Sequence, residues 1–521
     1  MRYSLVGLMI ALATPATAQL SDPLAMTTDP ADQAVMAEVA VAISSRKPDL
    51  AKLDILLAKL PRPTPLRGMV QTFRAMALSN LSDANPGPAT AAIEEALRLL
   101  PDDPRPKLAG SMIFTFSGAP QRAADLWMQA SRQAPELARM SDRYYMTALI
   151  ARLREFGDSA RADRVAARLG EIGFSAALAP ERSDSALANT RQAVRDRRDS
   201  EALSAVTAIG DPDDLLTLYV DRRYDMVWPR IAEWAAPDLS DQSRRYLEEL
   251  RSDWTAADDF HTAAPYAQRL AKMRSYAAVA QLFPPMFDRL RPGAYQEDAE
   301  RLAPIVARSL AVLGRDAEAR SLLDKVAAAM PADYGANALN IDGAYVTLGT
   351  IRTDWPEVIA RADLFLARAR SFGDSVNGSA LLQVQAWRAC ALWRTGREAE
   401  AQQAIAQVAM GSALLPSTVM SMHLCRGDSS SARTLLIARL ADENTRGWAL
   451  AFVQPTGAYA DTPLERLLNP VADGVRTSPE VVSAANAVGR ILPKPVDETV
   501  PEGFDPFRAK PVARPSGLDA I

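Results

Sequence analysis

The stretch SGAPQRAADLWMQASRQAP, residues 117–135, decides the fold class of this 521-residue chain. It contains a glycine, small residues, a tryptophan and a proline whose spacing recurs 34 residues earlier. The earlier counterparts are Ala89 for Ala123, Ile93 for Trp127, Ala96 for Ala130 and Pro101 for Pro135. A fixed period of this length indicates an array in which each repeat is one helical hairpin.

Each residue type fits a place in such a hairpin. Ala123 leaves room for two antiparallel helices to cross closely, and Trp127 lies one turn further along the same face, where it fills the space between helices. Pro135 lacks a backbone N–H and disfavours helix in the residue before it, so it ends the second helix. Gly118 permits the tight reversal between the two helices because it has no side chain to clash.

This pattern resembles the tetratricopeptide repeat at the positions that define that family. The matches to its turn, small, aromatic, small and proline sites, and to the aromatic site of its first helix, are Gly118, Ala123, Trp127, Ala130, Pro135 and Phe114. Lys107 and Ser111 stand where the family has tryptophan and glycine. The resemblance implies an all-α fold, a right-handed α-solenoid of paired helices. It does not specify an activity, since such repeats serve many kinds of partner.

Looser copies of the pattern follow later in the chain. In each, a turn glycine is followed five residues later by a small residue inside an apolar-periodic helix. The pairs are Gly157 with Ala162, Gly314 with Ala319, Gly396 with Ala401 and Gly427 with Ala432. Any helical hairpin can carry a glycine at a helix end, so that simpler explanation stays open for these copies.

Composition argues against several classes of protein. The formal net charge is −4 and no long basic run is present, so the chain lacks the electrostatic footprint of a nucleic-acid-binding protein. Two cysteines and two histidines are too few for a disulfide-stapled scaffold or for the usual zinc cage. We therefore expect no nucleic-acid partner, no metal and no cofactor.

The N-terminus has the three-part pattern of a secretory signal peptide. Arg2 supplies a positive charge, an apolar run covers residues 5–13, and the small residues Ala16 and Ala18 form a cleavage site. We expect cleavage after Ala18, which removes residues 1–18 and leads to a periplasmic or secreted protein. No later segment has the roughly 20 apolar residues that span a bilayer, so no transmembrane segment is expected after cleavage.

Proline, glycine and serine divide the rest of the chain into blocks. The expected divisions are a polar leader (19–33), N-terminal repeats (34–178), an irregular helical middle block (179–295), a second repeat block (296–440), capping helices (441–492) and a Pro-rich tail expected to be disordered (493–521). Within the middle block, Pro229 is expected to kink the helix predicted over 221–237.

No catalytic constellation is found in the sequence. It has no phosphate-binding glycine loop, no Gly-x-Ser-x-Gly elbow and no His-Glu-x-x-His pair. His423 and Cys425 are two residues apart, so on a helix they point in different directions and do not form a base–nucleophile pair. We therefore predict that the chain is not an enzyme.

A disulfide between the two cysteines, Cys390 and Cys425, is chemically possible in an oxidising compartment. Counted from the turn glycines Gly396 and Gly427, the two residues are offset by one helical turn, about 6 Å. Added to the about 8–10 Å between neighbouring helix axes, this offset strains the Cα separation of under about 7 Å that a disulfide needs. The sequence leaves the bond open.

In the tetratricopeptide family, positions on the first helices line an inner groove that holds partner peptides. Carried over by register, the residues that would line it here are Arg74, Arg105, Met112, Phe116, Tyr144, Arg154, Arg301, Arg308, Trp393 and Arg394. A groove that mixes arginine with methionine and aromatic side chains suits an extended peptide with acidic groups. Phe116 and Trp393 are equally compatible with packing against the next repeat.

The leading interpretation is an exported scaffold or adaptor that binds a protein or cell-envelope partner through its concave face. Two alternatives remain: an accessory factor or enzyme acting on cell-wall material, and a structural subunit of an envelope or secretion assembly. The sequence specifies neither the partner nor the oligomeric state.

Overall fold

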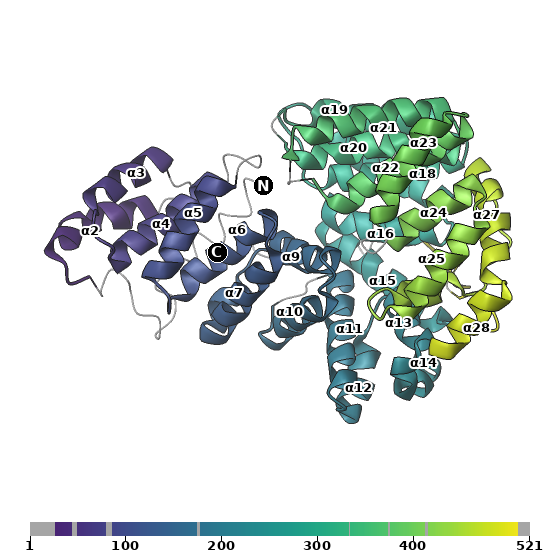
Figure 1. Cartoon of the computed structure of the whole chain (residues 1–521), viewed down its shortest axis with the longest axis horizontal. Coiled ribbons are helices and arrows are strands. Elements are labelled where there is room, and N and C mark those ends of the chain that lie inside the picture. The colour runs from purple at the N-terminus through teal and green to yellow at the C-terminus, as the bar shows by residue number, and fades with distance from the viewer. Residues whose placement is uncertain are drawn as a thin grey trace, which may run out of the picture. The chain divides into compact units, whose positions relative to one another are not determined.

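The computed structural model describes residues 27–43, 49–79, 86–174, 178–332, 334–373, 376–411, 415–496 and 498–508. These residues form mostly helices joined by turns (Figure 1). Across these ranges no β-strand is present, and one isolated antiparallel bridge joins Asp221 to Gly489. The predicted all-α architecture of helical hairpins is confirmed.

Two predictions concern membranes and export. The predicted signal peptide, residues 1–18, lies outside the described residues. Among the helices that the structure describes, none combines the length and the apolar character needed to cross a bilayer.

The chain forms two compact units. Unit 1 comprises residues up to 175 together with 371–377, and unit 2 comprises 176–370 and 378–521. The helices of unit 1 are α2 (Pro30–Ile43), α3 (Leu50–Lys59), α4 (Pro65–Ser79), α5 (Gly87–Leu99), α6 (Pro104–Phe116), α7 (Pro120–Gln133), α8 (Pro135–Arg139), α9 (Arg143–Glu155) and α10 (Ser159–Glu171). Within unit 1, α4 packs against α5, α6 against α7 and α9 against α10, which is the pairing that the repeat pattern predicts.

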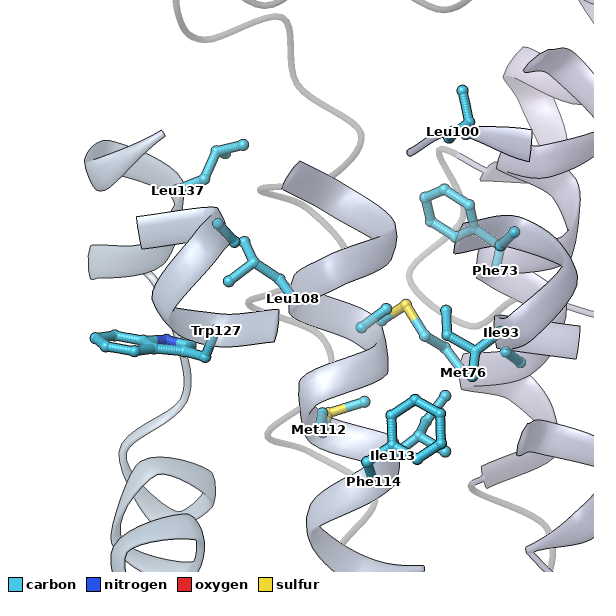
Figure 2. Packing of buried hydrophobic residues seen from close by; sticks show 14 of the residues in the cluster. Phe73, Met76, Ile93, Leu100, Leu108, Met112, Ile113, Phe114, Trp127 and Leu137 are labelled. Atoms are coloured by element: carbon cyan, nitrogen blue, oxygen red, sulfur yellow. The ribbon is translucent and has the colours of Figure 1, made fainter. Parts of the chain in front are cut away.

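The residues that define the repeat are buried in the core of unit 1. Ala89 is 2% exposed, and Ala123, Trp127 and Ala130 are each 0% exposed. Figure 2 shows Trp127 on α7 and Ile93 on α5 among the other apolar side chains of this core. The indole Nε1 of Trp127 donates a hydrogen bond to Ser141 Oγ over 3.2 Å, which satisfies the single polar atom of the buried ring.

The hairpin turns marked by glycine share one backbone geometry in both units. Their φ angles lie between +74° and +81°, and the next residue donates its N–H to the carbonyl oxygen five positions before it. These glycines are Gly118, Gly157, Gly314, Gly396 and Gly427. The residues five positions after them, all 0% exposed, are Ala123, Ala162, Ala319, Ala401 and Ala432. Glycine adopts this left-handed conformation without a steric penalty.

Three further turns have the same geometry without glycine. Arg197, Arg274 and Thr353 have φ angles of +57°, +59° and +59°, and the same hydrogen bond follows each of them. The residues five positions later are Ala202, Val279 and Val358, and all three are 0% exposed. Hairpins therefore occur also where the glycine pattern is missing.

Unit 2 contains the remaining helices. They are α11 (Ala179–Arg195), α12 (Asp199–Ala205), η1 (Val206–Ala208), α13 (Pro212–Val220), η2 (Arg222–Val227), α14 (Trp228–Ala235), α15 (Ser240–Ala257), α16 (Phe260–Lys272), α17 (Tyr276–Leu282), η3 (Pro284–Arg289), α18 (Ala299–Val312), α19 (Asp316–Ala329), η4 (Ala336–Ala338), α20 (Leu339–Ile351), α21 (Trp355–Arg370), α22 (Gly378–Arg394), α23 (Glu398–Met410), α24 (Pro416–Arg426), α25 (Ser429–Ala441), α26 (Arg446–Phe452), α27 (Pro463–Arg476) and α28 (Pro479–Val488), where η marks a 3₁₀ helix. The first helices of successive hairpins contact one another, α16 with α18, α18 with α20, α20 with α22 and α22 with α24.

Helices from the two ends of unit 2 share one core. Leu215 of α13 lies in the same buried cluster as Leu450 of α26, and α13 packs directly against α26. Arg490, just after α28, donates its main-chain N–H to Val220 O over 2.9 Å and its Nε to Tyr219 O over 2.8 Å. The array in unit 2 is therefore closed on itself, which the repeat pattern does not predict.

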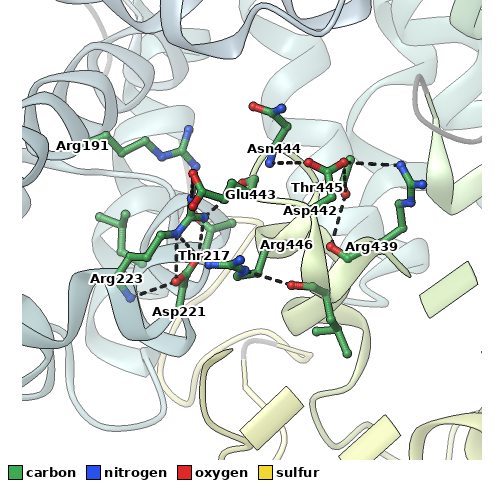
Figure 3. Close-up of polar contacts among 12 residues, drawn as sticks. Arg191, Thr217, Asp221, Arg223, Arg439, Asp442, Glu443, Asn444, Thr445 and Arg446 are labelled. Atoms are coloured by element: carbon green, nitrogen blue, oxygen red, sulfur yellow. Dashed lines mark hydrogen bonds and ion pairs between the residues drawn. The ribbon is translucent and has the colours of Figure 1, made fainter. Parts of the chain in front are cut away.

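A polar junction lies at this closure (Figure 3). Asp221 is fully buried, and its carboxylate accepts a hydrogen bond from Arg223 Nη2 over 2.6 Å. Arg223 also donates to Glu443 O, over 3.1 Å, in the loop between α25 and α26. In that loop, Asp442 accepts hydrogen bonds of 3.0 Å from Asn444 N and Thr445 Oγ1. Arg223 thus links the buried carboxylate of Asp221 to the loop between α25 and α26.

The structure adds detail to the block divisions expected from the sequence. Helix α2 begins at Pro30, inside the predicted leader. The middle block, the second repeat block and the capping helices all belong to unit 2. Pro229 does not kink a helix, because a separate 3₁₀ helix, η2, precedes α14 and places Pro229 in the first turn of α14, where its missing N–H is harmless.

The part of the predicted disordered tail that the structure describes, 493–496 and 498–508, is packed against unit 2. Phe504 is 8% exposed and joins the buried cluster that contains Phe260 and Tyr266. The guanidinium of Arg251 lies 5.3 Å from the centre of the Phe504 ring, and Arg251 Nη1 donates to Asp505 O over 3.1 Å. Pro506 O accepts a further hydrogen bond from Tyr266 Oη over 3.4 Å, so several contacts hold a segment whose proline content predicts disorder.

Candidate functional site

A groove with a volume of about 1020 Å³ lies within unit 2. Most of its lining comes from α16, α18, α20 and α22, the first helices of four successive hairpins. Asp213 of α13, Tyr246 of α15 and Glu465 of α27 also line it. Helices of the repeat stack and of the closing segments therefore share one cavity.

One face of helix α18, which carries two arginines with a proline and an isoleucine between them, lines the groove. Arg301, Pro304, Ile305 and Arg308 line it and recur at the spacing of one helix face. Nη1 of Arg301 lies 3.3 Å from Oδ1 of Asp298. Arg308 is exposed, and within the described ranges it forms no ion pair with a carboxylate. The register predicted both arginines for an inner groove, and both line this one.

On the next two helices, small residues and two carboxamide side chains line the groove. Gly343 and Ala344 of α20 and Ala380 of α22 are small residues of the lining, called here the floor of the groove. Asn340 of α20 and Gln383 of α22 stand exposed beside them. A carboxamide offers both donors and an acceptor, so these two side chains can bind a peptide group.

Apolar side chains that line the groove are Ile305, Val384, Phe365 and Trp387. Val384 and Phe365 are buried, so Ile305 and Trp387 offer the accessible apolar surface. Trp387 is half-buried and packs against the apolar core of unit 2. An indole that is fixed by the core but open on one side is a suitable surface for an apolar side chain of a ligand.

A paired cluster of charges occupies another part of the lining. Arg269 is 4% exposed, and its Nη1 lies 3.5 Å from Asp211 Oδ1 and 3.5 Å from Asp213 Oδ2. Lys272 pairs with Asp213 as well. Burial raises the pKa of Asp211, whereas for Asp213 the nearby Lys272 and Arg269 outweigh burial and lower the pKa. These four groups neutralise one another.

Two more carboxylates of the lining are also engaged. Glu465 lies 3.4 Å from Arg274 Nη2, and Arg274 also pairs with Asp461. Glu300 is 1% exposed and accepts a hydrogen bond from Tyr295 Oη over 2.7 Å, and burial raises the pKa of Glu300. In the described part of the chain, no group of three or more His, Cys, Asp or Glu side chains is placed to hold a metal ion.

The residues predicted for a groove in unit 1 are mostly engaged elsewhere. Arg74 Nε lies 2.6 Å from Asp54, and Arg105 Nη2 lies 2.5 Å from Asp103, the N-cap of its own helix. Met112 is 9% exposed and belongs to the core, so its assignment to the groove is wrong.

The other residues predicted for a groove in unit 1 lie in different environments. The ring centre of Phe116 lies 6.4 Å from that of Tyr145 on the next hairpin, which is the packing alternative noted for this residue. Arg154 is exposed. The side chain of Tyr144 is outside the described ones.

Trp393 and Arg394, at the end of α22, do not line the groove either. The guanidinium of Arg426 on α24 lies 4.8 Å from the Trp393 ring centre, so Trp393 packs against the next repeat. Arg394 donates a hydrogen bond to the main-chain oxygen of Cys425. Both side chains join α22 to α24.

The structure joins Cys390 and Cys425 by a disulfide, with 6.0 Å between the two Cα atoms. The separation expected from the turn register was too large. Helices α22 and α24 pack directly against each other, and Ala386, one turn before Cys390 on the same face, is small and buried. Small residues on the shared face allow a closer approach than the average helix spacing.

Sequence analysis missed Asn340, Gln383 and Trp387. The turn that follows α20 has Thr353 in the left-handed position, so the glycine pattern does not set the register of that hairpin. This accounts for Asn340 only. Gln383 and Trp387 lie on α22, whose hairpin has the turn glycine Gly396. Gln383 stands as many positions before Gly396 as Arg301 stands before Gly314, so the register could have predicted Gln383.

Comparisons with known proteins add little. No protein-family model matches the sequence, and no curated protein sequence matches it. Among solved structures, a chain of "Structure of Naa15/Naa10 bound to HypK-THB" is similar at 13% sequence identity and a TM-score of 0.24, covering 87% of this chain and 78% of that chain. At this TM-score the likeness says nothing about activity or partners.

Proposed function

We propose that the protein is a helical scaffold that binds a segment of a protein partner in the groove of unit 2. The observation that carries this proposal is the groove itself, lined by the first helices of four successive hairpins. It combines exposed carboxamides, a cation without a carboxylate partner in the described ranges and a half-buried indole, which is the mixture found at peptide-binding surfaces.

Binding rather than chemistry is what this lining supports. The acidic side chains of the groove are paired with arginine or lysine or buried against tyrosine. A general acid or base has to reach a substrate proton, and a carboxylate held by a neighbouring cation is poorly suited to that task. We therefore propose a non-catalytic role.

We also propose export to the periplasm or the cell exterior. The signal-peptide pattern over residues 1–18 supports it, and so does a disulfide between two cysteines that are both 0% exposed. Structural disulfides persist in oxidising compartments and are rare in the cytosol. Protein purified from its native host should begin at Gln19 and show two thiols only after reduction in denaturant. A chain that begins at Met1 with two free thiols would refute export.

Site-specific photo-crosslinking tests the groove. A benzophenone amino acid replaces Gln383 in the groove or, as a control, Leu364, which is 64% exposed on α21 and does not line the groove. The protein is expressed in its native host and irradiated in intact cells. We expect a discrete adduct from position 383 and none from position 364. Equal labelling at both positions, or labelling at neither, would contradict the groove as the binding site.

A further inference from the structure

We propose that the groove of unit 2 binds an extended segment whose acidic side chain is held by Arg308 and whose main chain is held by Asn340 and Gln383. This inference rests on the proposed function and specifies the chemistry of the partner. It is carried by three observations: the pairing of charges in the groove, the small residues of its floor, and the two exposed carboxamides.

The first step is the pairing of charges. The charged residues that line the groove are the cations Arg269, Lys272, Arg274, Arg301 and Arg308 and the carboxylates Asp211, Asp213, Glu300 and Glu465. Arg269 and Lys272 are paired with Asp213, Arg274 with Glu465, and Arg301 with Asp298 outside the lining. Within the described part of the chain only Arg308 presents its charge to the groove without a carboxylate partner. A carboxylate of the ligand would pair with Arg308 through a charge-assisted hydrogen bond.

The second step is the shape of the floor. Gly343, Ala344 and Ala380 are small residues of the lining that come from two neighbouring helices, α20 and α22. Larger side chains there would keep a ligand backbone away from the helices. A floor of small residues admits a main chain rather than only the tips of side chains.

The third step is the hydrogen bonding available at that floor. Asn340 and Gln383 are exposed, and in the described ranges neither side chain takes part in a hydrogen bond. A peptide in extended conformation has an N–H and a C=O at each residue that its own chain does not satisfy. A carboxamide can donate to the C=O and accept from the N–H of the same peptide unit.

Helix spacing gives the length of the segment. Neighbouring helix axes are about 8–10 Å apart, and an extended chain advances about 3.3 Å per residue. A segment that runs from Arg308 on α18 across α20 to Gln383 on α22 spans two helix spacings and therefore has roughly five to seven residues. Trp387 lies one turn beyond Gln383 on α22 and offers contact to an apolar side chain near one end.

The same charge pattern disfavours a polyanion as ligand. Nucleic acid and other polyanions gain affinity from several cations that each neutralise a phosphate. Among the described residues, the other cations of the lining are already paired with carboxylates, so the guanidinium of Arg308 is the one left for an anionic group of the ligand. One acidic group in an otherwise neutral, extended segment is what the lining accommodates.

The test uses a displayed library of random 12-residue peptides selected on the full-length purified protein. We expect the selected peptides to share at least one aspartate or glutamate. A synthetic peptide from this set should bind at least tenfold more tightly than its Glu→Gln or Asp→Asn counterpart. Arg308→Glu should abolish this preference, and Arg308→Lys should keep part of it. The matched control is Arg291→Glu, since Arg291 is also exposed in unit 2 but does not line the groove, and it should bind as the wild type does.

The variant Gln383→Trp, which fills the floor, separates the two levels of the proposal. If Gln383→Trp removes binding but peptides show no acidic preference, the groove binds peptides and the inference about Arg308 is overturned. If no peptide is selected, or if the selected peptides bind Gln383→Trp and wild-type protein equally, both the inference and the proposed function are overturned. Circular dichroism and thermal unfolding of each variant confirm that it is folded.

Discussion

At the scale of single residues, the hairpin turns need glycine for its backbone conformation and not because space around it is short. A Cβ placed on Gly314 or Gly396 would meet no atom within 4 Å, yet the φ angles there are +75° and +76°. Arg197 adopts a φ of +57° in the same type of turn and carries its side chain at a steric cost. For a non-glycine residue the left-handed conformation costs roughly 1–2 kcal/mol.

Substitutions at two turns should therefore change stability in opposite directions. We expect Gly314→Ala to lower the free energy of unfolding of unit 2 by about 1 kcal/mol and Gly314→Asn by clearly less, because asparagine tolerates left-handed backbone. Arg197→Gly should raise the free energy of unfolding by up to about 1 kcal/mol. Urea titrations measure all three. Equal losses for the alanine and asparagine variants would contradict a backbone origin.

Asp214 is a second residue with a predictable effect, through pH. Burial, together with the charges of Asp184 and Asp211, raises the pKa of Asp214 from 3.8 to about 7. The carboxyl group accepts a hydrogen bond from Ser183 Oγ over 2.7 Å, and so connects α13 to α11. Because the folded state holds this proton more tightly than the unfolded state, the contribution of Asp214 to stability is full below pH 4.

This stabilisation is lost as the pH rises from about 4 to about 7. Above about pH 7 the titration of Asp214 no longer changes the free energy of unfolding. We expect Asp214→Asn to remove this part of the pH dependence. Compared with the wild type, the variant should gain thermal stability at pH 8 relative to pH 5. Melting temperatures of both proteins at the two pH values provide the measurement, and parallel shifts in the two proteins would show that Asp214 is not the group responsible.

At the scale of elements, a short crossing of two chain segments closes unit 2. The guanidinium of Arg490 lies between two rings, 3.9 Å from the centre of Tyr219 and 4.0 Å from that of Trp228. Next to it, Gly489 forms the bridge to Asp221, and a Cβ on Gly489 would lie 2.2 Å from Val220 O. The segment after α28 can approach the end of α13 only because residue 489 has no side chain.

Gly489→Ala should therefore destabilise unit 2 by about 1–3 kcal/mol, the usual cost of forcing an extra methyl group into a packed site. The matched control is Gly474→Ala in α27, where a Cβ would meet no atom within 4 Å. Alanine is the better helix former, so this control should be neutral or stabilising by up to about 1 kcal/mol. Chemical denaturation of the two variants compares them directly. A neutral Gly489→Ala would mean that the crossing does not contribute to closure.

At the scale of the whole molecule, the two units have separate cores. The buried apolar residues of unit 1 form one cluster, from Val35 to Ile172, and those of unit 2 form two others. Each unit buries its own apolar surface, which is the main source of folding free energy. The units are therefore expected to unfold as separate cooperative blocks.

Residues 178–508, which contain the described residues of unit 2 together with the segment 371–377, should fold when expressed alone and unfold in one cooperative transition. Its midpoint should coincide with one of two transitions in the full-length protein, since the core clusters of unit 2 contain no residue of unit 1. Differential scanning calorimetry of both proteins gives the comparison. A fragment without a cooperative transition would show that unit 2 depends on unit 1.

The sequence predicts the structure that depends on residues close together in the chain. It does not predict the structure that depends on contacts between residues far apart in the chain. The turn glycines and the buried alanines after them set the hairpins, because both lie within one repeat. Closure of unit 2 depends on contacts such as Arg490 with Tyr219, 271 positions apart, which no repeat period encodes.

The candidate site shows the same division. Arg301 and Arg308 follow from the register of a glycine-marked hairpin and line the groove. Arg105 has the same register in unit 1 and pairs with the N-cap of its own helix, Asp103, as Arg301 pairs with Asp298, but it belongs to the other unit and does not line this groove. Register predicts the face on which a side chain begins, whereas the partner of a long side chain depends on neighbours that the period does not specify.

Closure of unit 2 also has an evolutionary consequence. An open array can gain or lose one hairpin at little cost, because each hairpin touches only its neighbours. In unit 2 the last helices must meet the first ones, so an inserted or deleted hairpin would leave Arg490 facing solvent instead of Tyr219 and Trp228. The number of hairpins between residues 212 and 490 is therefore fixed by geometry, and homologues should vary in loop length there but not in hairpin number.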